Sequence, residues 1–268
     1  MLKDCREEWY DPEKKVSVTL VDVTRAAQDL ARAHLCGPTA AYYLARGLAA
    51  AALLGAEMSE ADETVAVQLK CTGPLGGLNV ECSREGMLRG YTEKKILDGL
   101  DGMGAPKDKT ALGDCQIQVT HSVPGRILSQ GISNSLDGYL AGSLQRKATI
   151  RLEVSVSDEV EILEARGMLI EELPDGKDTG ILGVRFKSLA VTERNLLRQL
   201  GLEKAELKKT SPLSFKCRCS LERAAEMLAS LDEEERKALP PTIDITCHMC
   251  GKTYTVRTSV SHETSGLG

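Results

Sequence analysis

The chain has 268 residues, of which 42% are hydrophobic and 27% are charged, and this balance excludes a disordered chain or a fibre. The 39 acidic residues outnumber the 34 basic ones and give a net charge of -5, so the chain as a whole has no electrostatic attraction for nucleic acid or for an anionic membrane. Aromatic residues make up only 3%, which argues against a stacking surface for single-stranded nucleic acid.

The amino-terminal segment indicates the compartment. Residues 1–8 carry mixed charge and lack the apolar stretch of a secretory signal, so we expect a cytoplasmic protein. The most apolar segment, Ala40 to Ala56, has Arg46 near its middle and falls short of the ~20 strongly apolar residues of a membrane span. In a reducing compartment, nine cysteines indicate metal binding or redox chemistry rather than a disulfide framework.

Local patterns predict a strand followed by two helices. Val16 to Val23 alternates and is rich in β-branched residues, which favours a strand, and Thr24 to Leu35 contains good helix formers. Gly37 and Pro38 interrupt the chain and place proline where a new helix can start. The alanine-rich and leucine-rich segment that follows, up to Leu54, predicts a helix that is packed on most of its sides.

A change of period predicts a series of strands after residue 64. Residues 65–71 and 78–82 each place apolar side chains on one face, and the turn at 73–77 joins them into a hairpin. We expect further strands over Met87–Glu93, Asp114–Ser122 and Thr149–Ser157, and a helix over Asn134–Lys147. Because several strands follow one another without long crossovers, the predicted fold class is α+β, with an antiparallel sheet and packed helices in a large amino-terminal domain.

The sequence predicts three parts: an amino-terminal domain over 1–182, a helical linker over 183–214 and a carboxyl-terminal domain over 215–268. The linker is charged and poor in leucine, with Leu196 and Leu200 four apart on a short helix. Short isolated helices are marginal in water, so we expect a metastable segment that must pack on its neighbours. The last part contains a helix over Leu221–Leu231 and a hairpin-like end, and it is close to the smallest size that a core alone can stabilise.

Four cysteines near the carboxyl end form the strongest motif. Cys217 and Cys219 form one close pair, and 27 residues later Cys247 and Cys250 form another, which Gly251 follows. Two such pairs suit a tetrahedral Zn²⁺ site, because zinc prefers thiolate ligands and a Cys-x-x-Cys turn lets both sulfurs converge. Zinc binding could supply ~10–16 kcal/mol, which is comparable to the whole stability of a domain, ~5–15 kcal/mol. We therefore expect one zinc ion per chain.

Other interpretations of these cysteines stay open. They could be four unrelated structural residues, the zinc module could be purely structural, or His248 could replace one ligand. The narrow Cys-x-Cys pair can close a strained, readily reduced disulfide, which points toward a switch. The remaining five cysteines do not cluster in sequence: Cys5, Cys36, Cys71, Cys82 and Cys115. Three of them occupy inward positions on expected strands, where a buried cysteine behaves as a small apolar residue.

The cysteine spacing, placed after a large α+β domain and a charged linker, resembles that of the thirty-three-kilodalton heat-shock protein family of bacterial redox-regulated chaperones. The resemblance extends into the amino-terminal domain, in Leu48–Leu54, in Gly73–Cys82 and in the stretch Leu88-Arg89-Gly90-Tyr91. It covers most of the chain.

The resemblance implies a zinc-bound, inactive reduced protein and an active oxidised one. In the reduced form, all four close-pair cysteines would bind zinc. Oxidation would form the disulfides Cys217–Cys219 and Cys247–Cys250, release zinc and unfold the linker. The oxidised chain would then hold unfolding client proteins without ATP, and it could do so as a homodimer. Release of the segment from Val184 to Leu207 would expose the apolar face that it covers on the amino-terminal domain.

Other function classes find little support in the sequence. A zinc-ribbon adaptor with a purely structural metal is the alternative function, and zinc retention under peroxide would distinguish it. We find no catalytic constellation and expect no enzyme. Residues 102–110 superficially resemble a phosphate loop but lack its second glycine and its leading strand, so they predict a surface loop. His121 alternates with Ile117 and Val119, which indicates a sheet histidine rather than a general base.

Overall fold

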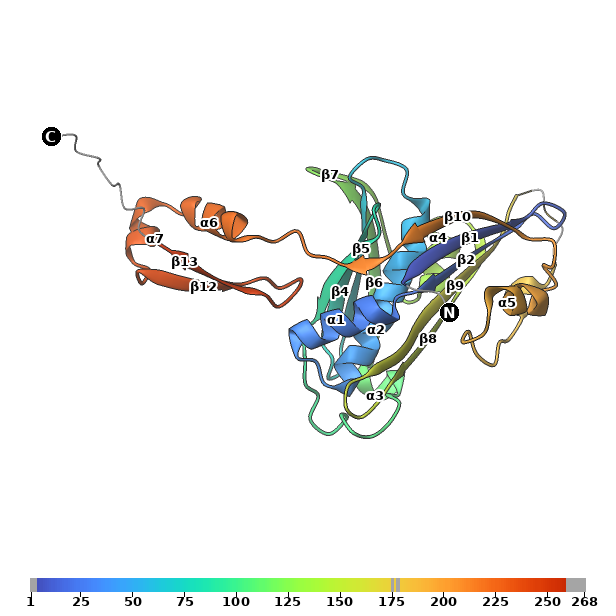
Figure 1. Ribbon diagram of the computed structural model, residues 1–268, viewed down its shortest axis with the longest axis horizontal. Helices are drawn as coiled ribbons and strands as arrows, with labels where there is room; N and C mark the ends of the chain where they lie inside the picture. The colour runs from blue at the N-terminus through green and yellow to red at the C-terminus, as the bar shows by residue number, and fades with distance from the viewer. Residues whose placement is uncertain (1–3, 175, 177–178, 259–268) are drawn as a thin grey trace. The chain divides into compact units, whose positions relative to one another are not determined.

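The computed structural model describes residues 4–174, 176 and 179–258. The chain forms two compact units, Met1–Lys216 and Cys217–Gly268. The predicted α+β class is confirmed, because the first unit combines runs of antiparallel strands with helices, and the second unit has its own hairpin and helices (Figure 1). Residues 183–214 belong to the first unit, while the division into three parts stays a prediction. None of the described helices has the length and apolar character needed to span a membrane.

One sheet of the first unit has five antiparallel strands in the order β10-β1-β2-β9-β8. Its strands are β1 Cys5–Asp11, β2 Val16–Asp22, β8 Lys147–Val156, β9 Ile162–Glu172 and β10 Glu206–Pro212. We call it the first sheet. Its central strands come from both ends of the unit's sequence, so the chain must close a long loop to form it.

The second sheet has six strands in the order β11-β5-β4-β3-β6-β7. Its strands are β3 Thr64–Cys71, β4 Gly77–Ser83, β5 Met87–Thr92, β6 Cys115–Val123, β7 Arg126–Ser133 and β11 Ser214–Phe215. All neighbours are antiparallel except β11, which pairs in parallel with β5. The predicted hairpin is confirmed as β3 and β4, with Val67 opposite Val80.

Helix α2 lies between the two sheets and forms the centre of the core (Figure 1). It contacts β3, β4 and β5 of the second sheet and β2, β8 and β9 of the first. Fourteen of its seventeen residues are buried, which confirms the prediction of a helix packed on most sides. Small alanine side chains let both sheets approach the helix closely. The helices of the unit are α1 Thr24–His34, α2 Pro38–Leu54, α3 Asp108–Ala111, α4 Leu136–Gly142 and α5 Glu193–Gln199.

Two expected helices differ from the observed elements. The helix expected over Asn134–Lys147 is limited to α4, since its glycines disfavour helix and β8 begins at Lys147. The expected linker is only partly helical: α5 is present, but Glu206–Pro212 is strand β10. β10 pairs with β1, so the backbone hydrogen bonds of this charged edge are made with a distant strand rather than within a helix.

The segment after residue 180 covers the outer face of the first sheet. Leucines 189, 196, 197, 200 and 202 are all at most 6% exposed. They form one apolar cluster with residues of β2 and β9, namely Val16, Val18, Leu20, Met168 and Ile170. We call this the outer cluster. The first sheet therefore has apolar residues on both faces, with α2 on one side and the linker leucines on the other.

The second unit is small and has little apolar core. It contains α6 Leu221–Ala229, α7 Glu233–Lys237 and the hairpin of β12 Thr242–Thr246 and β13 Thr253–Arg257. Its buried apolar cluster contains Ala224, Leu228 and Val256, with partly buried neighbours. The helix predicted over Leu221–Leu231 is confirmed as α6, and the hairpin-like end is confirmed as β12 and β13.

Candidate metal centre

The first cysteine pair lies just before helix α6. The Ser220 hydroxyl caps this helix by accepting a hydrogen bond from the Arg223 amide at 3.2 Å. The Arg223 guanidinium donates to the Arg218 carbonyl at 2.8 Å. These two contacts fix the backbone between Cys217 and Cys219 relative to the helix, although the pair itself lies in an irregular segment.

The second pair lies in the turn between β12 and β13. The Cys247 carbonyl accepts hydrogen bonds from the Gly251 amide at 2.8 Å and from the Cys250 amide at 3.4 Å, and the Cys247 amide donates to the Lys252 carbonyl at 2.9 Å. Gly251 has a φ of +72°, in the left-handed region that glycine adopts at little cost. This tight turn places the sulfurs of Cys247 and Cys250 on the same side, as the Cys-x-x-Cys-Gly sequence predicts.

All four cysteine sulfurs lie within 4.8 Å of one another. The Sγ atoms of Cys217 and Cys247 are 3.8 Å apart, and those of Cys219 and Cys250 are 3.4 Å apart. Four sulfurs at ~2.3 Å from a tetrahedral zinc ion would be about 3.8 Å from each other. The four side chains are thus close enough to hold one metal ion, and thiolates are the ligands that zinc prefers.

The environment of the second pair, Cys247 and Cys250, favours the protonated thiols when no cation is bound. Burial raises the pKa of Cys247, and the neighbouring Cys217 raises it further. Burial also raises the pKa of Cys250, with hydrogen bonds to the Cys219 and Cys217 sulfurs adding to the effect. Four thiolates this close together would repel one another, and a divalent cation between them removes that cost. Metal binding therefore releases protons, so metal affinity should fall as the pH falls.

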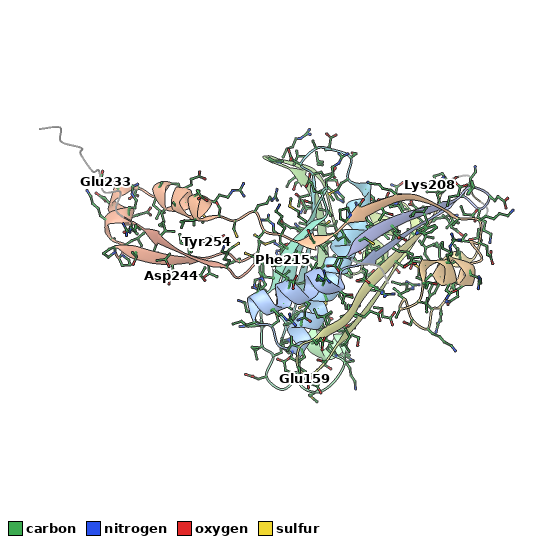
Figure 2. All side chains as sticks on the ribbon, in the orientation of Figure 1. Glu159, Lys208, Phe215, Glu233, Asp244 and Tyr254 are labelled. Carbon is green, nitrogen blue, oxygen red and sulfur yellow. The ribbon has the colours of Figure 1, made fainter. Side chains whose placement is uncertain are left out.

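Tyr254 supports the centre from β13, and no sequence pattern points to it. Its hydroxyl donates to the Cys219 carbonyl at 3.2 Å and lies 3.2 Å from the Cys219 sulfur. The hydrogen bond to Cys219 is the main cause that raises the pKa of Tyr254. The Lys252 ammonium lies 4.9 Å from the centre of the tyrosine ring. Figure 2 labels Tyr254 among the side chains of the second unit. A group that orients a ligand in this way tunes a metal site without binding the metal.

His248 lies between the second pair but is not in the cluster. Within the described residues, the cluster that could hold a metal contains only the four cysteines, and the His248 side chain is exposed. His121 has the structural role predicted for it: its Nδ1 lies 2.9 Å from the Glu63 carboxylate in the buried part of the second sheet. Burial raises the pKa of Glu63, but hydrogen bonds from the Glu60 amide and from His121 more than offset this and lower it overall.

The other features noted in the sequence belong to the first unit, whereas the four clustered cysteines belong to the second. Residues 102–110 form an exposed loop that ends in the short helix α3, as predicted. Cys36 and Cys82 are buried in the main core, while Cys71 and Cys115 are partly exposed. The structure therefore brings the four cysteines singled out by spacing into one cluster, and the other five are not part of that cluster.

Comparison with known proteins gives a consistent result. The sequence model of the family described as Hsp33 protein matches residues 8–257. A 33 kDa chaperonin of Thermus thermophilus is 29% identical over 88% of this chain and 79% of its own length, and that of Geobacillus kaustophilus is 28% identical over 86% and 87%.

A solved structure has the same fold. The crystal structure of the 33 kDa chaperonin of Thermotoga maritima superposes with a TM-score of 0.79 over 95% of both chains, at 18% identity. At that identity the likeness establishes the fold alone, whereas the family model spans nearly the whole chain. The chain belongs to the Hsp33 protein family.

Proposed function

We propose that this protein is a redox-regulated holdase: reduced and zinc-bound it is inactive, and oxidised it holds unfolding proteins without ATP. Its relatives named 33 kDa chaperonin support the chaperone class. The observation that supports redox regulation is that the second unit brings four thiols together and has a core cluster of three buried apolar residues. We further propose that Cys217, Cys219, Cys247 and Cys250 are the zinc ligands.

Metal binding supplies the stability that this small core lacks. Ala224, Leu228 and Val256 bury little apolar surface, and a unit of this size rarely folds on such a core alone. Binding of zinc by four cysteines is worth ~10–16 kcal/mol in small zinc modules. The fold of the second unit therefore depends on the four thiolates, and their oxidation removes its main stabilising interaction.

Oxidation by peroxide converts the ligands in pairs. One thiolate attacks a peroxide oxygen and becomes a sulfenic acid with release of hydroxide, and a second thiol displaces its hydroxyl group to form a disulfide and water. All four sulfurs lie within 4.8 Å of one another, and the contacts of 3.8 Å and 3.4 Å join one pair to the other, so their positions do not select sequence neighbours as partners. Once the unit loosens, sequence neighbours meet fastest, because short loops close at the lowest entropic cost. We therefore propose Cys217–Cys219 and Cys247–Cys250 as the disulfides.

Unfolding of the second unit destabilises the linker through the covalent connection between them. β11 has only two residues, Ser214 and Phe215, and Lys216 alone separates it from Cys217. An unfolded chain attached there favours release of β11, and after it of the segment that forms the outer cluster. Release uncovers the apolar side chains of β2 and β9 that the linker leucines bury. Contiguous apolar surface of this kind is what captures unfolded chains.

Light scattering of a heat-unfolded client tests the proposal. The full-length protein is added in the absence of ATP, either reduced and zinc-loaded or treated with peroxide under mild warming. The oxidised form should suppress aggregation, the reduced form should not, and reductant with zinc should reverse the effect. Equal protection by both forms would mean a chaperone without a redox switch. Protection by neither would favour an adaptor with a structural zinc site.

A further inference from the structure

Two cysteines outside the metal centre face each other across the second sheet. Cys71 is the last residue of β3 and Cys115 is the first residue of β6, and the register of the two strands pairs them directly. Opposite residues of an antiparallel pair point to the same face of the sheet. Their own strands carry Leu69 and Ile117 on that face, which lies toward α2.

The backbone places this pair at a position that suits a disulfide. The Cys71 amide donates to the Gly76 carbonyl, away from β6, and the next pair along is joined by a hydrogen bond from the Thr72 amide to the Asp114 carbonyl at 3.0 Å. Cys71 and Cys115 are therefore a non-hydrogen-bonded pair, in which the Cα atoms are typically ~4.5 Å apart. Disulfides span Cα separations of ~4.4–6.8 Å, so this pair lies within the required range.

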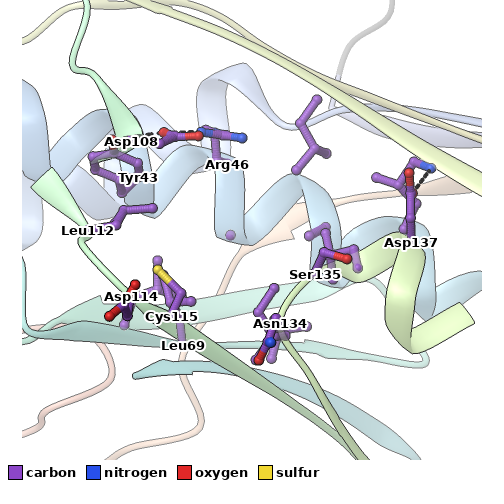
Figure 3. A pocket seen from close by; sticks show the side chains of 18 of the residues that line it. Tyr43, Arg46, Leu69, Asp108, Leu112, Asp114, Cys115, Asn134, Ser135 and Asp137 are labelled. Carbon is purple, nitrogen blue, oxygen red and sulfur yellow. Dashed lines mark hydrogen bonds and ion pairs between the residues drawn. The ribbon is translucent and has the colours of Figure 1, made fainter. Parts of the chain in front are cut away.

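Both thiols can be reached by a small oxidant. Each residue is partly exposed, and neither sulfur is in a disulfide. Cys115 lines an open pocket of about 720 Å³ between α2, the second sheet and α4, where its side chain lies beside Leu69 and Asp114 (Figure 3). The Cys115 sulfur makes a weak contact with the Gly113 carbonyl, at 3.6 Å. Rotation about the Cα–Cβ bond can therefore turn the sulfur toward Cys71 at little cost.

We propose that Cys71 and Cys115 form a cross-strand disulfide when the protein meets peroxide, independently of the metal centre and of the proposed function. One thiolate attacks a peroxide oxygen and becomes a sulfenic acid, releasing hydroxide. The opposite thiol then displaces hydroxide from that sulfur, so the two thiols lose two hydrogens and one peroxide becomes two waters.

This site responds to higher oxidant doses than zinc-bound thiolates do. Burial raises the pKa of Cys71, with a further contribution from Cys115. Burial also raises the pKa of Cys115, and the carboxylates of Asp108 and Asp114 add to this. Fewer of these thiols are ionised at neutral pH, so their attack on peroxide is slower. The disulfide closes a loop that contains β4, β5 and α3, and it ties β3 to β6 at the end of the sheet.

Peptide mapping of the full-length, zinc-loaded protein tests the proposal across a range of peroxide doses. Free thiols are blocked before digestion with trypsin and with a protease that cleaves after glutamate. The cut after Glu81 is needed because Cys82 otherwise shares a tryptic peptide with Cys71. We expect one fragment pair, 71–81 joined to the fragment that contains Cys115, at a mass two hydrogens below that of the separate thiol peptides.

Variants separate the disulfide from general oxidation. Cys71→Ser and Cys115→Ser should each abolish the linked fragments, whereas Cys36→Ala, which removes a buried thiol, should keep them. Among oxidised samples, the amino-terminal unit of the wild type and of Cys36→Ala should unfold on the order of 5–10 °C above that of Cys71→Ser, because the closed loop restricts the unfolded chain. Recovery of both cysteines as blocked thiols, as sulfinic acids or in disulfides with other cysteines would overturn the proposal.

Discussion

Replacing Leu202 by alanine should activate the chaperone without oxidation. Leu202 is fully buried in the outer cluster, at 0% exposure, and it lies in the linker rather than in the sheet. Removing a buried leucine side chain costs ~2–5 kcal/mol. Each ~1.4 kcal/mol changes an equilibrium constant tenfold, so the open state of the segment becomes roughly 30-fold to 5,000-fold more populated. This holds when the lost free energy destabilises the packed linker and not its open state.

Two assays follow this shift. Hydrogen exchange should accelerate at the amides of Leu196, Leu200 and Leu202, which donate to carbonyls within the same segment. In light scattering, the reduced and zinc-loaded variant should then suppress aggregation of a client that the reduced wild type leaves unprotected. The matched control is Leu207→Ala in the same segment, because Leu207 is 45% exposed and should change neither measurement.

Faster exchange without client protection would refute the reasoning. In that case the linker of the Leu202→Ala variant opens while zinc stays bound, and the surface it uncovers is not where clients bind. Unchanged exchange would refute it at an earlier step, since the leucines would then not hold the segment closed. The zinc content of the variant serves as the control for an intact metal centre, and its thermal unfolding as the control for a folded amino-terminal unit.

Three further predictions concern the metal centre and the second sheet. Cys250→Ser should lose most of its zinc by metal analysis, because a closed tetrahedral site loses one ligand, and full zinc content would contradict the ligand set. Trypsin cuts after Arg218, so in the oxidised protein the Cys217–Cys219 disulfide should hold two tryptic fragments together, whereas cross-pairs would attach them to the fragment of the second pair. Because the pKa of Glu63 is lowered by folding, its contribution to stability is present at neutral pH and lost as the pH falls through that lowered value. Glu63→Gln should therefore have a flatter decline of Tm in acid than the wild type, and an unchanged decline would contradict this.

The elements that the sequence predicts best are those whose local pattern agrees with what surrounds them in the fold. The hairpin of β3 and β4 alternates because one face of each strand is buried against α2. Helix α2 is apolar on most sides because sheets cover it from two directions, and proline and glycine mark its start. In such segments the local pattern and the tertiary environment agree.

Other elements depend on contacts that no local pattern records. β9 is buried by α2 on one face and by the outer cluster on the other, so its side chains do not alternate between apolar and polar. β10 is an exposed, charged edge strand, and its own residues do not alternate between apolar and polar. It forms a strand because it pairs with β1, some 200 residues earlier in the chain. The helical linker expected from the local pattern is therefore wrong for this strand.

In the candidate metal centre too, some features can be predicted from local sequence and others depend on distant contacts. Each close pair of cysteines is a local signal, because two or three residues of turn suffice to bring both sulfurs to one side. The contact of Tyr254 with Cys219 joins residues that are 35 positions apart, and nothing near either residue predicts it. Likewise, Cys71 lies opposite Cys115 because of the register between β3 and β6. That register is not a local property, since β4, β5 and α3 separate the two strands in the chain.

The central claim is that, in the wild-type protein, loss of zinc from the four cysteines is what uncovers the client surface. A single peroxide titration measures it most directly, with released zinc and protection of a heat-unfolded client determined on the same samples. The account predicts that both rise together at each dose, and that reductant with zinc reverses both. Protection that rises while zinc stays bound, or zinc that leaves without protection, would contradict the account.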